Sequence, residues 1–267
     1  MLTSIRGLVT ATLLAGTMLA SAPAFADETD PPSDITVTGS AALVSSYRFR
    51  GLAQSDNKPA VQGAITVTHS SGFYVGTWGS SASAGNGPID IGGTEIDVFG
   101  GFAKQVGTSG VTVDVGGYGY IYPGATFGNY YEVYGSVSKS IGPATAKVGV
   151  NFAPAQKVFN YNWTSSARSN AYVYGDLSSG LPGTPLTLHG HLGHTGGGFD
   201  YAKPYLDYNA GVTWKWKALA LDASLVGTSI SGNDIDSGFG CTGNTSCIDY
   251  FKRMSKPVGV VSLTASF

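Results

Sequence analysis

Apolar and polar residues alternate along most of the chain with the two-residue period of a β-strand. In residues 35–43 the odd positions carry Ile, Val, Gly, Ala and Leu, and the even positions carry Thr, Ser and Ala. Because successive side chains of a strand point to opposite faces, this pattern gives one apolar and one polar face. Similar segments predict about twelve strands, most of them near the roughly 9–11 residues that cross a bilayer obliquely. The predicted strands are residues 35–50, 60–70, 72–81, 94–106, 111–122, 130–141, 144–153, 170–177, 186–193, 208–217, 218–230 and 257–267.

The connections between these strands alternate between short and long. The short ones are residues 70–72, 107–110, 142–143, 178–185 and 217–218, and the long ones are 52–59, 82–93, 123–129, 154–169, 194–206 and 231–256. An up-and-down membrane barrel has short periplasmic turns, longer extracellular loops and an even number of strands. A soluble β-sandwich also has many short strands, but it does not predict this alternation. We therefore predict an all-β, antiparallel, up-and-down transmembrane β-barrel as a single domain over residues 27–267.

The composition favours a wall that faces lipid. Charged residues make up 12% of the chain, where a soluble domain has about 25%. An outward Lys or Arg costs about 2–4 kcal/mol at the midplane of the membrane, so a lipid-facing barrel avoids such charges. No segment after residue 26 has about 18 consecutive apolar residues, so we expect no helical span. The formal net charge of −2 gives no attraction to nucleic acid, and the expected partner is membrane lipid.

The N-terminal residues 1–26 have the features of a secretory signal peptide. They contain one basic residue, Arg6, then an apolar stretch, and they end in Ala24-Phe25-Ala26. A short apolar core before a small-x-small site predicts cleavage after Ala26, because the core is too short to span the membrane. A retained amphipathic anchor is the alternative, but the segment lacks a polar face. The chain is therefore expected to be exported.

The C-terminal strand ends on an aromatic residue, Phe267. Its residues from 259 to 267 alternate apolar and small polar side chains, and no tail follows. This ending resembles bacterial outer-membrane β-barrel proteins, whose assembly machinery reads a terminal Phe. The resemblance implies a location in the outer membrane of a Gram-negative bacterium, with Phe267 as the assembly signal and the barrel-assembly machinery as a partner.

Several blocks of sequence support a more specific resemblance. Residues 45–63 read SSYRFRGLAQSDNKPAVQG and residues 71–80 read SGFYVGTWGS, followed by EIDVFG at 95–100, YYEVYG at 130–135 and AKVG at 146–149. Together these blocks resemble the TorF porin family of Gram-negative bacteria. The resemblance covers nearly all of the mature chain and implies an outer-membrane barrel with a pore, but it does not name the solute.

Charged residues of both signs fall on the inward-facing parity of the predicted strands. They are expected to line the pore, and they are Arg48, Arg50, Glu95, Asp97, Asp114, Glu132, Lys147, Lys215 and Asp222. In a barrel of about twelve strands, the arginines at the extracellular end of the first strand should face Glu95, Asp97 and Glu132 across the lumen. The opposed charges either create a transverse field across a wet constriction or pair directly and close the lumen.

Aromatic residues on the outward parity predict two girdles at the membrane surfaces. Tyr47 and Phe49 end the first strand and are expected near the outer leaflet, whereas Trp214 and Trp216 are expected near the inner leaflet. The alternative for each of them is an ordinary aromatic residue of a hairpin.

The cysteines and histidines supply two further candidate sites. Cys241 and Cys247 lie close together in the last long loop, and an exported compartment favours a disulfide between them over a metal or redox role. His189 and His191 share the lumen face of one strand, with His194 after them, and they form a weak metal-binding candidate. A solvated histidine pair is the favoured interpretation, and no cofactor is expected.

These features together favour a passive pore for small polar solutes. Eight strands enclose a lumen that side chains just fill and 16–18 strands leave a clear channel, so a barrel of intermediate size can be a narrow pore or closed. The alternatives are a non-conducting structural or adhesion barrel and an outer-membrane hydrolase. The sequence has no Gly-x-Ser-x-Gly motif, so we do not predict an enzyme.

Overall fold

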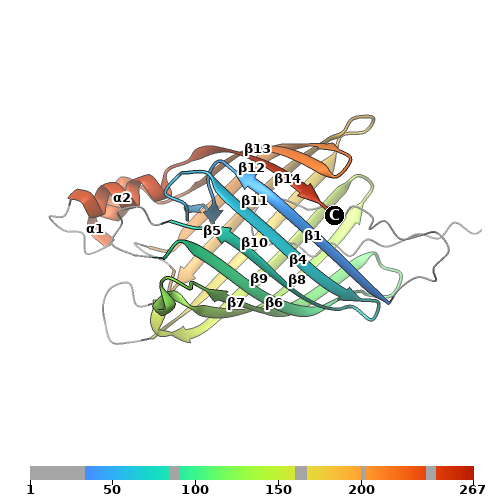
Figure 1. Cartoon of the computed structure of the whole chain (residues 1–267), viewed down its shortest axis with the longest axis horizontal. Coiled ribbons are helices and arrows are strands. Elements are labelled where there is room, and N and C mark those ends of the chain that lie inside the picture. The colour runs from blue at the N-terminus through green and yellow to red at the C-terminus, as the bar shows by residue number, and fades with distance from the viewer. Residues whose placement is uncertain (1–33, 84–90, 160–166, 200–202, 239–244) are drawn as a thin grey trace, which may run out of the picture.

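The computed structural model describes residues 34–83, 91–159, 167–199, 203–238 and 245–267. Within these residues, twelve long antiparallel strands form a closed barrel (Figure 1), which confirms the predicted fold class. The strands are β1 (Ile35–Val44), β4 (Ala60–His69), β5 (Phe73–Ser81), β6 (Thr94–Gln105), β7 (Val111–Ile121), β8 (Tyr130–Ile141), β9 (Ala144–Gln156), β10 (Arg168–Gly180), β11 (Leu186–Gly197), β12 (Tyr205–Trp216), β13 (Leu219–Thr228) and β14 (Val258–Ser266).

Each long strand pairs with its neighbours in the chain, and β1 pairs with β14 to close the barrel. Residues 40–44 of β1 pair with residues 262–266 of β14. Phe267 extends this seam, because its N–H donates to the carbonyl of Gly39 at 3.0 Å and its carbonyl accepts from the N–H of Gly39 at 2.7 Å. The last residue of the chain is therefore bonded to the first strand.

The two ends of the barrel differ in the length of their connections. Tight turns join the strands at one end, where the C-terminus also lies, and the long connections meet at the other end (Figure 1). The long connections contain small elements: β2 (Arg48–Phe49), β3 (Leu52–Ala53), η1 (Thr126–Gly128), η2 (Lys157–Phe159), α1 (Gly232–Gly238) and α2 (Thr245–Ser255). This arrangement follows the predicted alternation of short turns and long loops.

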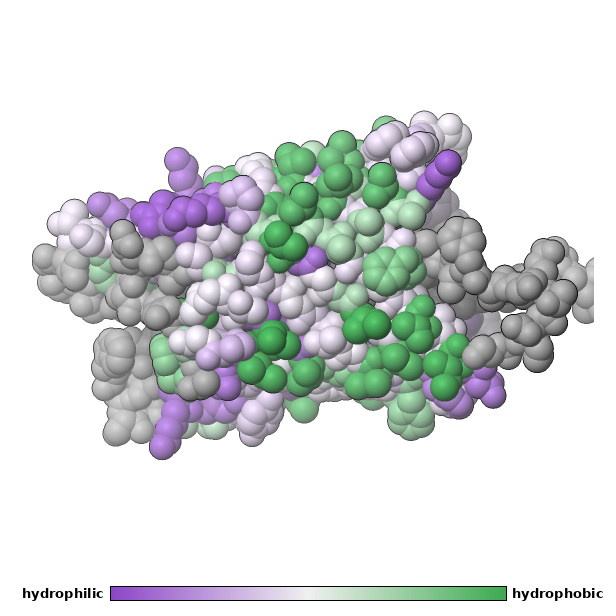
Figure 2. All heavy atoms as spheres, viewed as in Figure 1, coloured by the Kyte–Doolittle hydropathy of each residue, from purple (hydrophilic) through white to green (hydrophobic). Residues whose placement is uncertain are grey.

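The barrel wall has an apolar exterior and a polar interior. On β8, for example, Tyr131, Val133 and Val137 are exposed, whereas Glu132 and Ser136 are buried. Figure 2 shows apolar residues gathered over the strands and polar residues toward both ends of the barrel. Outward apolar residues between polar rims suit a wall in contact with lipid.

The helices of the described segments are too short and too polar to cross a membrane.

The first strand is shorter than the sequence predicts. It ends at Val44, and the chain then turns into the barrel as a hairpin in which β2 pairs with β3. We call residues 45–59 the lumen hairpin. Its tight turn places Arg50 and Gly51 at φ +46° and +79°. A Cβ atom on Gly51 would lie 2.6 Å from the carbonyl oxygen of Gly227, so only glycine fits there. The arms of this hairpin are also extended, so apolar and polar residues continue to alternate beyond Val44. For this reason the pattern did not indicate where β1 ends.

The last long connection contains the helices α1 and α2, which pack over the lumen hairpin. Ala53 of the hairpin forms an apolar cluster with Ile235 of α1 and with α2 side chains. Ser231 and Asp234 cap α1: the Ser231 N–H donates to an Asp234 carboxylate oxygen at 2.7 Å, and the Asp234 N–H donates to the Ser231 hydroxyl at 3.4 Å. Lys203 lies 2.7 Å from the same carboxylate and, with Ser231, lowers the pKa of Asp234 to about 2.

Candidate functional site in the barrel lumen

Aromatic rings fill one side of the lumen at the end with the long connections. Tyr120 on β7 and Tyr130 on β8 stack with ring centres 4.2 Å apart. Tyr130 also contacts Phe159 of η2 at 5.4 Å and Phe199 at 5.1 Å. These rings are buried, so this part of the barrel is filled by packed side chains.

A buried ion pair crosses the lumen beside these rings. One guanidinium nitrogen of Arg50, Nη2, lies 2.6 and 2.8 Å from the two carboxylate oxygens of Glu132 on β8. Both side chains are at most 1% exposed. The Asn151 side chain donates a further bond to Glu132 at 3.1 Å, and the Tyr172 ring lies 4.2 Å from the guanidinium carbon of Arg50. Of the two arrangements considered for the opposed charges, Arg50 and Glu132 therefore adopt direct pairing.

Arg48 ties the lumen hairpin to the end of α2 instead of facing the acids across the lumen. Its Nη1 donates to the carbonyls of Met254 at 2.8 Å, Gly51 at 3.1 Å and Lys256 at 3.3 Å. The expectation that Arg48 faces Glu95 and Asp97 is wrong, because the chain has left the barrel wall before this residue.

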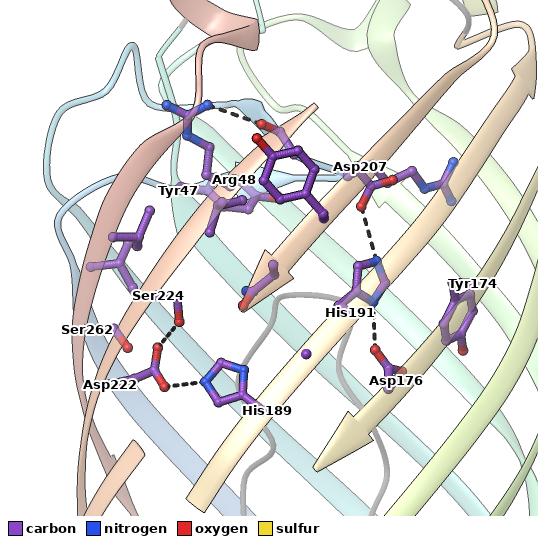
Figure 3. A pocket seen from close by; sticks show the side chains of 18 of the residues that line it. Tyr47, Arg48, Tyr174, Asp176, His189, His191, Asp207, Asp222, Ser224 and Ser262 are labelled. Carbon is purple, nitrogen blue, oxygen red and sulfur yellow. Dashed lines mark hydrogen bonds and ion pairs between the residues drawn. The ribbon is translucent and has the colours of Figure 1, made fainter. Parts of the chain in front are cut away.

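Beside the lumen hairpin, a cavity of about 140 Å³ is lined by residues of β1, β4 and β9–β14. We call it the lumen cavity. Figure 3 shows that histidines and acids from neighbouring strands point into it. Its lining includes Lys147 on β9, Tyr174 on β10 and Ser262 on β14, together with the arginines of the hairpin. Acidic, basic, hydroxyl and aromatic groups therefore share one small space inside the barrel.

Carboxylates on β10, β12 and β13 hold the two inward histidines of β11 (Figure 3). His191 Nδ1 lies 2.6 Å from Asp176 on β10, and His191 Nε2 lies 3.1 Å from Asp207 on β12 and 2.7 Å from the hydroxyl of Tyr172. His189 Nε2 lies 2.7 Å from a carboxylate oxygen of Asp222 on β13. These bonds fix the orientation of both imidazole rings, since each ring has a carboxylate partner on another strand.

Comparison with known proteins places the chain in a family. A family model described as "Bacterial protein of unknown function (Gcw_chp)" matches residues 28–267. The chain belongs to the Gcw_chp family. No curated protein matches it.

Among solved structures, a NanC porin is similar to this Gcw_chp chain with a TM-score of 0.53 and 11% identity, covering 87% of this chain and 99% of the porin. Outer membrane phospholipase A from Escherichia coli has a TM-score of 0.45 and 11% identity, covering 91% of this chain and 94% of the phospholipase. A porin structure refined at 1.8 Å has a TM-score of 0.42 and 10% identity, covering 87% of this chain and all of that one. At such low identity the likeness to the NanC porin shows the fold alone, which is that of an outer-membrane β-barrel.

Four other charged residues were predicted to face the lumen. They lie on the inner face of the Gcw_chp barrel, at different positions along its length. Asp114 on β7 accepts from the Tyr74 hydroxyl at 2.7 Å, and Lys147 lies 5.7 Å from the Tyr174 ring centre. Asp222 accepts from Thr213 at 2.6 Å as well as contacting His189. Lys215 is half-buried on β12 near the tight-turn end. The structure thus brings Asp222 to His189 and leaves Asp114 and Lys215 in other parts of the lumen.

The two aromatic residues predicted for the outer girdle lie inside the barrel. Tyr47 is 2% exposed and donates to Glu95 at 3.0 Å, and Phe49 packs on Tyr120 with ring centres 5.7 Å apart. Their assignment as girdle residues is wrong, because the lumen hairpin carries them inward. Asp97, the other acid expected to meet the arginines, is buried on β6.

On β12, Trp214 and Trp216 are 43% and 53% exposed on the outward face next to a tight turn. Their role at the membrane surface stays a prediction.

Asp176 and Asp207 were missed by the sequence analysis, although they hold His191. Asp176 lies on the inward parity of a predicted strand and could have been found by the rule that identified Asp222. Asp207 was assigned outside a strand, because the sequence predicted that the strand begins at Tyr208 whereas β12 begins at Tyr205. An error at a strand end therefore removed one acid of the site.

The two other candidate sites do not gain support. No group of three or more His, Cys, Asp or Glu in the described part of the chain is arranged to hold a metal ion. His194 is exposed on the outward face of β11, away from His189 and His191. Cys241 lies outside the described residues, so its bond to Cys247 stays a prediction, as does the signal peptide of residues 1–26.

The geometry around His189 also differs from that of an activated serine. Ser224 donates to Asp222 at 2.5 Å, and His189 contacts the other oxygen of the same carboxylate. A nucleophilic serine needs a hydrogen bond to the base that removes its proton. In the Gcw_chp barrel the serine is bonded to the acid instead.

Proposed function

We propose that this Gcw_chp barrel is a porin-like channel of the outer membrane that lets small polar solutes diffuse passively. The observation that carries the proposal is the lumen cavity, because it is lined by charged and polar groups inside a closed barrel with an apolar exterior. A lumen of this character offers hydrogen bonds to a solute that the membrane excludes. The sequence resemblance to TorF porins supports the same function.

The lumen hairpin would be the constriction of this channel. Lumen residues near the tight-turn end, such as Thr187 and Lys215, are half-exposed. Those at the opposite end, such as Glu95, Asn151 and Asn170, are at most 1% exposed. A solute would therefore meet the main barrier at the hairpin and the rings packed beside it. Because the cavity lining has both signs of charge, the channel is expected to select only weakly between cations and anions.

Single-channel recording on the refolded protein in planar bilayers tests the proposal. Reproducible conductance steps from a preparation that is folded, as shown by its heat-modifiable mobility on a gel, would support a pore. Folded protein that leaves the bilayer silent would overturn it in favour of the non-conducting barrel. Release of fatty acid or peptide fragments by the same sample would instead support a hydrolase.

Two segments of the chain would direct it into the outer membrane, the signal peptide and the C-terminal strand. Phe267 would be the residue that the barrel-assembly machinery recognises, and the signal peptide would direct export before cleavage after Ala26. The exposed Trp214 and Trp216 would then lie at the inner boundary of the lipid, since they are next to a tight turn.

A further inference from the structure

Several residues that line the lumen cavity carry buried polar atoms without a hydrogen-bond partner in the described part of the chain. Arg50 Nε and Nη1, one carboxylate oxygen of Asp207, the side-chain oxygen of Asn209 and the hydroxyl of Ser262 make no hydrogen bond within the described residues. All four residues line the cavity. Arg50, Asp207 and Ser262 are 5%, 3% and 4% exposed. Buried polar groups are nearly always satisfied, so these atoms indicate a partner that the fold itself does not supply.

The unpartnered atoms require a ligand that both donates and accepts hydrogen bonds. Arg50 can only donate, an ionised Asp207 can only accept, and the hydroxyl of Ser262 can do either. Hydroxyl groups suit this set because each of them is a donor and an acceptor at once. A ligand with several hydroxyls would therefore satisfy groups from the lumen hairpin, β12 and β14 together.

The charges around the cavity favour a neutral ligand. Its described lining residues include three acids, three strong bases and two histidines that are bonded to those acids: Asp176, Asp207, Asp222, Arg48, Arg50, Lys147, His189 and His191. Arg50 is also paired with Glu132. An anion would meet three carboxylates and a cation would meet three basic side chains, so neither sign gains a clear electrostatic advantage over a neutral molecule.

The size and one wall of the cavity narrow the ligand class further. The volume of about 140 Å³ is below the roughly 300 Å³ at which pockets for drug-sized ligands begin, so a ligand of about one ring fits best. Tyr172 and Tyr174 line the same space, with ring centres 5.6 Å apart. Aromatic rings provide an apolar surface for the C–H groups of a ligand whose hydroxyls reach the polar atoms.

We propose that the lumen cavity binds a small neutral polyhydroxyl compound of about the size of a monosaccharide. The inference rests on the proposed function in one respect: the compound would be the solute that the channel passes. Binding itself requires only the folded barrel. A failure of binding and a failure of conduction are therefore separate results.

The test is calorimetric titration of the refolded full-length protein in detergent with three probes: glucose, glucuronate and glucosamine. The proposal expects saturable binding of glucose that is at least as tight as that of the acid or the amine. Ser262→Ala removes one hydrogen bond at the cavity and should weaken glucose binding about 2- to 10-fold. Ser136→Ala is the matched control, because Ser136 is a buried lumen serine on β8 that does not line the cavity.

Several results would overturn the proposal. They are the absence of saturable binding of glucose, preferential binding of glucuronate or glucosamine, and equal weakening of glucose binding by Ser262→Ala and Ser136→Ala. Asn209→Leu supplies a second variant should Ser262→Ala fail to fold, and it should also weaken glucose binding. Glucose binding by a barrel that conducts no current would support this inference and overturn the channel. Conduction without glucose binding would do the reverse.

Discussion

The ion pair between Arg50 and Glu132 gives the sharpest test of how the hairpin is held in the lumen. The variant Arg50→Met removes the charge but keeps an unbranched apolar side chain in the packed site. Glu132 then remains buried with the Asn151 amide at 3.1 Å and the Tyr120 hydroxyl at 3.4 Å as its remaining donors. Neither of these groups carries a charge, so the carboxylate loses its counter-charge without gaining access to water.

The expected loss of stability follows from this burial. Breaking a buried ion pair by removing one partner costs about 3–5 kcal/mol, because the other charge is left uncompensated. Both side chains here are at most 1% exposed, so solvent screening does not reduce the effect. The double variant Arg50→Met/Glu132→Gln removes both charges and should recover most of the loss. Arg253→Met is the matched control, because Arg253 pairs with Asp56 at 2.8 Å while 45% exposed, and exposed pairs contribute about 0–1 kcal/mol.

Urea titration of the four proteins in detergent, followed by tryptophan fluorescence, measures these free energies of unfolding. Conductance in planar bilayers measures the accompanying change at the constriction, and Arg50→Met should raise it because the hairpin loses its tie to β8. A stability within about 1 kcal/mol of the native protein for Arg50→Met would contradict the reasoning, since a loss of 3–5 kcal/mol is expected for a dry buried pair. So would a double variant that is no more stable than the single one.

Three further predictions concern other parts of the chain. Deletion of Phe267 should lower the amount of barrel in the outer membrane far more than it lowers the stability of refolded protein, and quantitative blotting of membranes against urea titration checks this. Cys241 and Cys247 should be bonded to each other, so thiol titration of non-reduced, denatured protein should find no free thiol. The guanidinium of Arg253 and the ammonium of Lys58 hold the pKa of Asp56 below its usual value, although partial burial opposes them. A lowered pKa stabilises the fold above the usual carboxyl pKa of about 3.9, and this stability is lost as the pH falls through the pKa of the folded state. Amide exchange of α2 should therefore accelerate only in acid. The variant Asp56→Asn should remove that pH dependence.

The barrel could be predicted from the sequence because its signal is repeated in every strand. A period of two fixes which side chains face inward without knowledge of any distant contact. Glu132, Lys147 and Asp222 were assigned to the lumen in this way, and the structure places each of them on the inner face. The same rule needs only the approximate limits of each strand, so small errors at strand ends leave most assignments intact.

The contacts between strands far apart in the chain could not be predicted in the same way. Tyr47 and Phe49 continue the alternation of β1, and no local signal separates a continuing strand from a hairpin that folds inward. The choice depends on the rings of β7 and β8, which offer a buried surface only once the barrel has closed. Parity also does not say that Arg50 reaches Glu132 whereas Arg48 bonds to backbone carbonyls, because that depends on the depth of the hairpin.

The position of the lumen hairpin depends more on the barrel than on the helices above it. At the mouth, α2 holds the hairpin through the bond of Arg48 to the Met254 carbonyl, through the apolar cluster at Ala53 and through the exposed pair of Arg253 and Asp56. The exposed pair contributes little because water screens it. Inside the lumen, Tyr47 bonds to Glu95 on β6 and Arg50 bonds to Glu132 on β8, and all four side chains are buried. Separation of these bonds would leave the buried carboxylates of Glu95 and Glu132 without the hairpin's donors, which costs more than loss of contacts to backbone carbonyls. Removal of the helical contacts alone should therefore leave the hairpin in the lumen. The proposed constriction would therefore be held mainly by the strands and the hairpin, with the helices packed over it.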